Sequence, residues 1–167
     1  MSGPTVSLAL EVDASALPVS EDALRDGVLS ILGAAEFPGA LSLAVVDDQL
    51  MRRLNRNHHA TDAATDVLAF PLRDFDDPTP RREGEFDAEV VVSVTTAVRE
   101  AGERGLDAAS ELFLYVTHGV LHLMGYDDHE PDDAREMHER TLEILGALGF
   151  ESRIDGIGPT PTQRGSR

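Results

Sequence analysis

The segment between Asp107 and Gly125 constrains the fold more than any other part of the sequence. Asp107 is a typical N-cap residue and Gly125 is a typical helix terminator, so one helix is predicted to run from the first to Met124. Most residues in it are apolar, chiefly Leu, Val, Phe and Tyr with Ala and Met. Because a helix that is apolar on most sides needs cover all round, we expect the rest of the chain to bury it.

The segments around this helix predict a small sheet and further helices. Alternating or continuous apolar runs predict strands at 6–12, 41–46, 65–70 and 90–92. Caps and helical spacing predict four other helices. The first starts at Ser20 and ends before Phe37, and the others span about 48–57, 95–104 and 132–148. The polar segment 72–87 is expected to be a flexible loop.

This order of elements, β-α-β-α-β-β-α-α-α, predicts a single α+β domain with a small mixed sheet of about four strands and about five helices. We place the domain at residues 1–151, with the metal site discussed below on the buried helix and the turn after it. Residues 152–167 are rich in Gly, Pro, Ser and Thr and are predicted to form a flexible C-terminal tail.

Composition excludes several classes of protein. A chain of 167 residues with 41% hydrophobic and 27% charged residues is an ordinary globular domain, not a disordered chain. The absence of cysteine removes disulfides, thiolate metal sites and cysteine nucleophiles. No apolar run approaches the roughly 20 residues of a membrane span, and the N-terminus has no basic region before an apolar stretch. We therefore expect a cytoplasmic protein without membrane contact.

The charge argues against general nucleic-acid affinity. The chain has 31 acidic residues against 14 basic ones, a formal net charge of −17, and this field repels nucleic acid at long range. A nucleic-acid partner would therefore need a local site. Arg52 and Arg56 lie four positions apart on a predicted helix and form a candidate RNA-binding strip. A solvated helix face paired with Asp47 or Asp48 explains them at least as well.

Three histidines at the end of the apolar helix suggest a metal centre. His118 and His122 lie one helical turn apart, so both imidazoles point the same way. The turn after Gly125 can bring His129 back toward that pair. Three neutral imidazoles leave one position of a tetrahedral Zn²⁺ open for water, which can then attack an acyl or phosphoryl centre.

A chance pair of histidines four positions apart is the simpler reading of this pattern. The apolar surroundings weigh against it, since burying imidazoles without partners is costly. Asp127 and Asp128 also follow at the helix end, where carboxylates could orient the imidazoles. Gly119 stands where the zinc-protease motif HExxH has its glutamate, which demotes peptidase chemistry. A structural zinc site would need four ligands and usually cysteine.

The sequence resembles the YbeY-type rRNA maturation factors, which are single-strand-specific metal-dependent endoribonucleases. Residues 118–129, HGVLHLMGYDDH, are similar to the family signature HGxLHLxGYDH. Upstream, Asn55 and TDVLAFP at 65–71 resemble the stretch N…YR…D.PTDVLSFP, and AEVVVS at 88–93 resembles GDIVIS. The resemblance covers roughly residues 5–150 in matching order.

Three departures from the family pattern concern the site. The third family histidine falls on Asp128, with His129 one residue later, so either one could be the third ligand; we favour His129. The arginine that the family is thought to use on the phosphate is replaced by His59, our candidate for a phosphate contact or proton relay. An imidazole with an ordinary pKa near 6.5 is mostly neutral at pH 7. Ala88 and Glu89 stand in place of Gly-Asp.

The resemblance implies a Zn²⁺-dependent endoribonuclease with one zinc ion per chain. Its substrate would be single-stranded RNA, its role 16S rRNA 3′-end maturation, ribosome biogenesis and ribosome quality control, and its partners components of the small ribosomal subunit; no DNA partner is expected. A metal-dependent hydrolase of another substrate remains open, as does an assembly factor with a mainly structural metal. His138 lies among Glu136, Glu139 and Arg140 and is expected to be an exposed helix residue outside the site.

Overall fold

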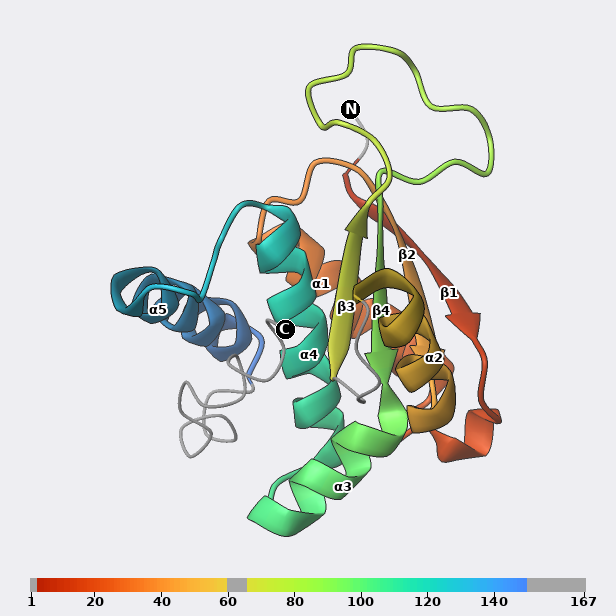
Figure 1. Cartoon of the computed structure of the whole chain (residues 1–167), viewed down its shortest axis with the longest axis vertical. Helices are drawn as coiled ribbons and strands as arrows, with labels where there is room; N and C mark the ends of the chain where they lie inside the picture. Colours follow the sequence, from red (N-terminus) through yellow and green to blue (C-terminus); the bar gives the residue numbers. More distant parts are fainter. Residues whose placement is uncertain (1–2, 60–65, 150–167) are drawn as a thin grey trace.

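The computed structural model describes residues 3–59 and 66–149, and its elements follow the predicted order (Figure 1). The strands are β1 (Thr5–Leu10), β2 (Ala40–Val46), β3 (Val67–Pro71) and β4 (Ala88–Ser93). The helices are the short 3₁₀ helix η1 (Ala14–Ala16), α1 (Glu21–Ala34), α2 (Asp48–His59), α3 (Val94–Arg104), α4 (Ala108–Leu123) and α5 (Pro131–Ala147). The chain is therefore a single α+β domain, as predicted.

The four strands form one mixed sheet in the order β1-β2-β4-β3. β1 and β4 both run parallel to β2, while β3 is antiparallel to β4 at one edge. The parallel pair β1–β2 is joined through α1, the usual crossover for parallel strands. This arrangement confirms the small mixed sheet that the sequence predicts.

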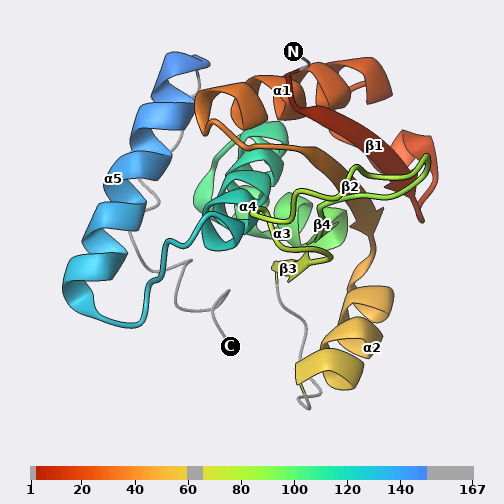
Figure 2. The same ribbon diagram turned by 90° about the horizontal axis from the view of Figure 1, so that it is seen from above.

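Helices cover both faces of the sheet, and the strands alternate accordingly. Seen from above, α1 and α4 lie on one face and α2 lies on the other (Figure 2). In β2, Leu41, Leu43 and Val45 belong to the main core with α1, α4 and α5. Ala44 and Val46 pack with the α2 side instead, because successive side chains of a strand point to opposite faces.

The helix α4 is the buried centre of the domain, as its apolar sequence predicts. Every residue from Ala109 to Leu121 is buried. The Asp107 side chain caps the helix by accepting a hydrogen bond from the Ser110 N–H at 3.1 Å. At Gly119 an added Cβ would lie 2.9 Å from Val90 Cγ1, so glycine is what allows α4 to approach β4 this closely. The end of α4 that carries the histidines is thereby fixed against the sheet.

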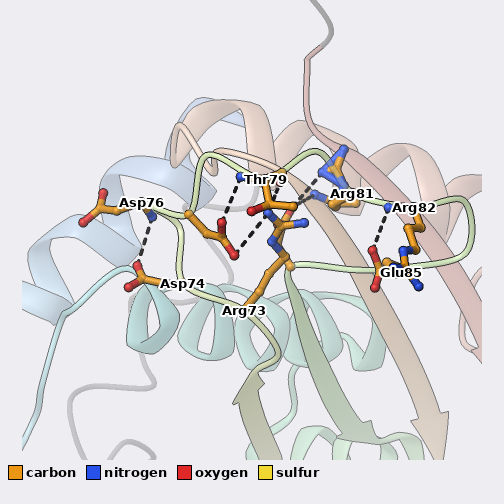
Figure 3. A network of polar contacts seen from close by, with 10 residues as sticks. Arg73, Asp74, Asp76, Thr79, Arg81, Arg82 and Glu85 are labelled. Carbon is orange, nitrogen blue, oxygen red and sulfur yellow. Dashed lines mark hydrogen bonds and ion pairs between the residues drawn. The ribbon is translucent and has the colours of Figure 1, made fainter.

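The segment between β3 and β4 is an irregular loop whose polar groups bond to one another (Figure 3). Its anchor is the buried carboxylate of Asp87, which accepts hydrogen bonds from the Ala40 N–H at 2.8 Å and from Arg81 Nη1 at 2.9 Å. Arg73 Nε lies 3.5 Å from the other oxygen of Asp87, and Arg73 also donates to the Thr79 carbonyl. These arginines therefore hold the loop together.

Two predictions fall outside the described residues: the C-terminal tail at 152–167 and the first residue of the strand at 65–70. The extent of the domain, residues 1–151, likewise stays a prediction. Within the described ranges, no helix combines the length and the apolar character needed to cross a membrane.

Candidate metal centre

His118 and His122 lie near the C-terminal end of α4, one turn apart, as predicted. His118 is 4% exposed, while His122 is half-buried. Burial, with smaller contributions from the neighbouring imidazoles of His122 and His138, lowers the pKa of His118 to about 3. At pH 7 the His118 imidazole is therefore neutral, which is the form that binds a metal ion.

The turn after α4 is built by Gly125 and Asp127. Gly125 adopts a left-handed conformation with φ +100°, and the Tyr126 N–H donates to the Leu121 carbonyl at 3.0 Å, closing the helix end. The Asp127 carboxylate then accepts from the backbone N–H groups of Asp128 and His129 at 2.7 and 3.2 Å. These bonds fix the course of the chain toward α5.

His129 faces away from the protein interior in this turn. Its imidazole is exposed and its Nδ1 pairs with the Asp127 carboxylate. That hydrogen bond raises the pKa of His129, and the same contact lowers the pKa of Asp127. Before His129 could bind a metal ion through Nδ1, this pair would have to separate.

Asp128 has the opposite placement. Its side chain is 7% exposed, and neither carboxylate oxygen has a hydrogen-bond partner among the described residues. A buried ionised carboxylate without a partner is unfavourable, so the position fits a residue that binds a cation. A carboxylate oxygen and a neutral imidazole such as that of His118 are both ligand types that a divalent transition metal such as zinc takes. The placement of the two residues favours Asp128 over His129 as third ligand, a choice that stays open.

Only part of the predicted ligand set is assembled within ligand distance. Among the described residues, one group of three acidic or histidine side chains, Asp127, Asp128 and His129, has potential ligand atoms within 4.8 Å of one another. His118 and His122 are not members of that group. The turn and the helix therefore contribute two separate halves of the predicted centre.

His138 was wrongly predicted to be an exposed helix residue; its exclusion from the site stays a prediction. It is half-buried on α5, and its imidazole is the smallest of three causes that lower the pKa of His118. It also lines a cavity of about 380 Å³ with Asp128 and His129. Its neighbour Met137 is fully buried against the core.

The predicted RNA-binding strip lies elsewhere. Arg52 and Arg56 are exposed on α2, which covers the face of the sheet opposite to α4 (Figure 2). His59 is the last residue of α2, and its side chain lies outside what the structure describes. Neither arginine lines the cavity that contains Asp128 and His138. The roles assigned to these residues stay predictions.

Comparison with known proteins gives a consistent result. The family model described as endoribonuclease YbeY matches residues 12–149. A relative from Myxococcus xanthus, named endoribonuclease YbeY, is 45% identical over 110 residues, which make up 66% of this chain and 37% of the relative. A relative of the same name from Moorella thermoacetica is 39% identical over 142 residues, covering 80% of this chain and 91% of the relative. The chain thus spans little more than a third of the first relative and nearly all of the second.

The fold also has a solved counterpart. The solution structure of TM1509 from Thermotoga maritima matches with a TM-score of 0.54 at 21% identity, covering 93% of this chain and 97% of that one. At this identity the likeness supports the architecture alone. The family rests on the sequence matches, which extend from before α1 to the end of α5 and include the histidine segment of α4. The chain belongs to the endoribonuclease YbeY family.

Proposed function

We propose that this protein is a zinc-dependent endoribonuclease that cleaves single-stranded RNA. Membership of a family whose members carry the name endoribonuclease supports the reaction class. The observation that carries the metal dependence is Asp128, a buried carboxylate without a hydrogen-bond partner among the described residues, on the turn that follows two helix-borne imidazoles.

In this proposal one zinc ion per chain is held by His118, His122 and a third ligand, Asp128 or His129. The ion, when bound, supplies an activated water or a polarised phosphate. The residues of the chain do the rest. His118 offers a neutral ring nitrogen because burial keeps it unprotonated, and Asp127 keeps the turn in place through its two backbone hydrogen bonds. A carboxylate among the ligands also offsets the charge of the cation.

The substrate must be held against a strongly acidic protein. Because the protein has a net charge of −17, it repels RNA at long range, and RNA binding depends on local contacts. His59 is proposed to contact the phosphate near the scissile bond. Arg52 and Arg56 would contact the backbone of an RNA strand that continues past the edge of the sheet, since they belong to α2, which lies on the face opposite to α4.

The cellular role follows from the family resemblance. We propose cytoplasmic action on the 16S rRNA precursor, in 3′-end maturation, ribosome biogenesis and quality control, with components of the small ribosomal subunit as partners. The domain responsible would comprise residues 1–151.

Cleavage of a labelled RNA that spans the 16S 3′ end tests the reaction, with the same sequence as a duplex for comparison. We expect cleavage of the single strand, its loss on chelation and its return with Zn²⁺. Replacing a residue that only orients a metal ligand typically lowers metal affinity or activity 10–100-fold. Loss of a ligand itself, in His118→Ala, should therefore slow cleavage by about 100-fold or more. Glu139→Gln, at an exposed position of α5, is the matched control and should cleave normally.

Two other outcomes would replace the proposal. Chelator-sensitive hydrolysis of peptides or esters without RNA cleavage would identify a hydrolase of another substrate. About one equivalent of tightly bound metal without turnover would identify an assembly factor with a structural metal, a reading that His59 in place of the family arginine favours. Cleavage that survives both chelation and His118→Ala would contradict metal dependence.

A further inference from the structure

A groove lies between α2 and the sheet, on the face opposite to α4. Its volume is about 440 Å³, which falls in the range of roughly 300–1,000 Å³ typical of small-molecule sites. Ala44 and Val46 of β2 and Val91 of β4 line the groove from the sheet, and Leu50 and Leu54 line it from α2. Helix α2 therefore leaves a hollow above an apolar part of the sheet.

The rim of this groove exposes apolar surface to solvent. Leu72, directly after β3, lines the groove and is 53% exposed, more than any other large hydrophobic side chain among the described residues. A single exposed leucine is ordinary, but Leu72 continues the apolar surface formed by Leu50 and Leu54. Concave and continuous apolar surface of this kind is typical of a ligand-binding groove.

Two glutamates are the charged side chains that line the groove among the described residues. Glu89 is half-buried on β4, and Glu11 is exposed directly after β1. Glu89 pairs with Ser42 near the start of β2, whereas the Glu11 N–H donates to the Val45 carbonyl near its end. Carboxylates repel phosphate groups but accept hydrogen bonds from amino groups. The groove therefore suits a flat apolar group with N–H donors on its edge, such as an amino-bearing nucleobase.

The strand β3 separates this groove from the histidine-bearing turn of α4. A Cβ added at Gly119, which follows His118, would lie 3.1 Å from Val67 Cγ2, so this turn of α4 packs directly against β3. Val67 belongs to the core on the α4 side, and its neighbour Leu68 belongs to the cluster on the α2 side. Because β3 is an edge strand, RNA that passes round it reaches both faces of the sheet (Figure 2).

We propose that this groove binds a nucleobase of the single-stranded RNA substrate and prefers bases with an exocyclic amino group. The inference rests on the RNA substrate of the proposed function and adds a base-binding site to it. Glu89 accepts a hydrogen bond from the amino group, and Leu50 and Leu72 contact the base. Arg53, which is exposed and three positions after Leu50 on α2, contacts the flanking phosphate. Only an unpaired base can leave its stack and enter the groove, so the site selects single strands.

RNA binding by the full chain in the presence of a chelator tests this without cleavage. Fluorescence anisotropy compares labelled octamers of cytidine and of uridine. We expect the cytidine octamer to bind about tenfold more tightly, because uracil has a carbonyl where cytosine has its amino group. Glu89→Gln should remove most of this preference, and Leu72→Ser should weaken binding of the cytidine octamer several-fold.

Two matched controls lie on α3, outside the groove. Glu103→Gln removes the same charge from an exposed position and should keep the preference for cytidine. Val98→Ser removes an apolar side chain that is 48% exposed and should keep the affinity. Equal affinity of the wild type for both octamers would overturn the proposal, as would groove variants that behave like these controls.

A second measurement on the wild-type protein avoids any folding defect of the variants. The methyl resonances of Leu50, Leu72 and Val91 should shift when the cytidine octamer is added. Unchanged resonances with the RNA bound would overturn the proposal. Groove resonances that respond to a synthetic peptide of alternating leucine and arginine, but not to RNA, would also overturn it by assigning the groove to a polypeptide.

These outcomes separate the inference from the proposed function. If the zinc-loaded wild type cleaves RNA but the groove takes no base, the inference fails and the function stands. If the groove binds the base but no RNA is cut with any metal, the inference stands and the endoribonuclease proposal fails. If the wild type binds no RNA, both fail.

Discussion

Two aspartates with the same burial have opposite surroundings. Asp87 and Asp128 are each 7% exposed. The Asp87 carboxylate accepts hydrogen bonds from the Ala40 N–H at 2.8 Å and from Arg81, and it forms an ion pair with Arg73. Asp128 has no hydrogen-bond partner among the described residues. The Asp87 carboxylate is therefore stabilised by groups of the protein, whereas the Asp128 carboxylate is available to bind a cation.

The different surroundings of the two carboxylates indicate different roles: Asp87 stabilises the fold, and Asp128 is a candidate ligand for a cation. A buried carboxylate with three donors anchors the loop between β3 and β4 to the start of β2, and the tight packing of Gly39 against it leaves no room for a side chain. A buried carboxylate without donors is unfavourable for folding unless a cation binds. Asp128 belongs to the candidate metal centre, so a bound cation would offset this unfavourable burial.

Replacing each aspartate by asparagine tests the comparison most directly. In metal-free protein, Asp87→Asn should lower the free energy of unfolding by about 3 kcal/mol, because two arginines lose their counter-charge in a part-buried site. Asp128→Asn should change it by less than about 1 kcal/mol or raise it, since an unpaired charge is removed. Urea unfolding monitored by circular dichroism measures both, and equal losses would contradict the difference we describe.

Adding metal should reverse the ranking of the two variants. Zinc at 100 times its Kd should raise the free energy of unfolding of the wild type by about 2.7 kcal/mol. Asp87→Asn should keep this increment, because the loop does not take part in the centre. Asp128→Asn should lose most of it at the same zinc concentration. If Asp128→Asn keeps the full increment while His129→Gln loses it, the third ligand is His129.

The sequence predicted the fold well because its signals are local. The apolar helix between Asp107 and Gly125, the cap at Ser20 and the apolar runs of the strands each specify an element with little help from distant residues. Even the burial of α4 could be predicted, because an apolar helix too short for a membrane span has to be covered by protein.

The site was predicted less completely because its geometry depends on contacts between elements. Which of Asp128 and His129 turns inward depends on how Asp127 binds the backbone of the turn. Whether His138 is exposed depends on the rotation of α5, which is set by Met137 against the core. The arginines of the loop offered no sequence signal for their shared partner Asp87, which follows Arg81 by 6 residues and Arg73 by 14.

Acid should lower the free energy of unfolding of the metal-free protein through His118. Metal-free folded protein keeps His118 neutral down to a pKa of about 3, whereas in the unfolded chain it titrates near 6.5. The unfolded state therefore binds the extra proton as the pH falls below about 6.5, and stability is lost by up to about 1.4 kcal/mol per pH unit. Above pH 6.5 this contribution is fully present.

The measurement compares the wild type with His118→Asn by urea unfolding at pH 7, 6 and 5 in the presence of a chelator. The wild type should lose stability more steeply than the variant over this range. Carboxylates titrate in both proteins, so their effect cancels in the difference. Parallel curves would show that His118 accepts a proton in the folded state, against its buried position.

The smallest effects concern the two arginines that serve Asp87, and they test whether the loop is held as tightly as its hydrogen bonds indicate. The Arg81 side chain is 37% exposed, so Arg81→Gln should lower the free energy of unfolding by about 0.5 kcal/mol, the usual size for a solvated pair. The Arg73 side chain is 16% exposed and also contacts Asp77 and the Thr79 carbonyl, so Arg73→Gln should cost about 1–2 kcal/mol. Urea unfolding of the two variants beside Asp87→Asn measures the ranking.

A double variant of Asp87 and Arg73 should be less destabilised than the sum of the singles, because both changes remove the same interaction. Strict additivity would mean that Asp87 is stabilised chiefly by the Ala40 N–H, and that the arginines contribute little to anchoring the loop.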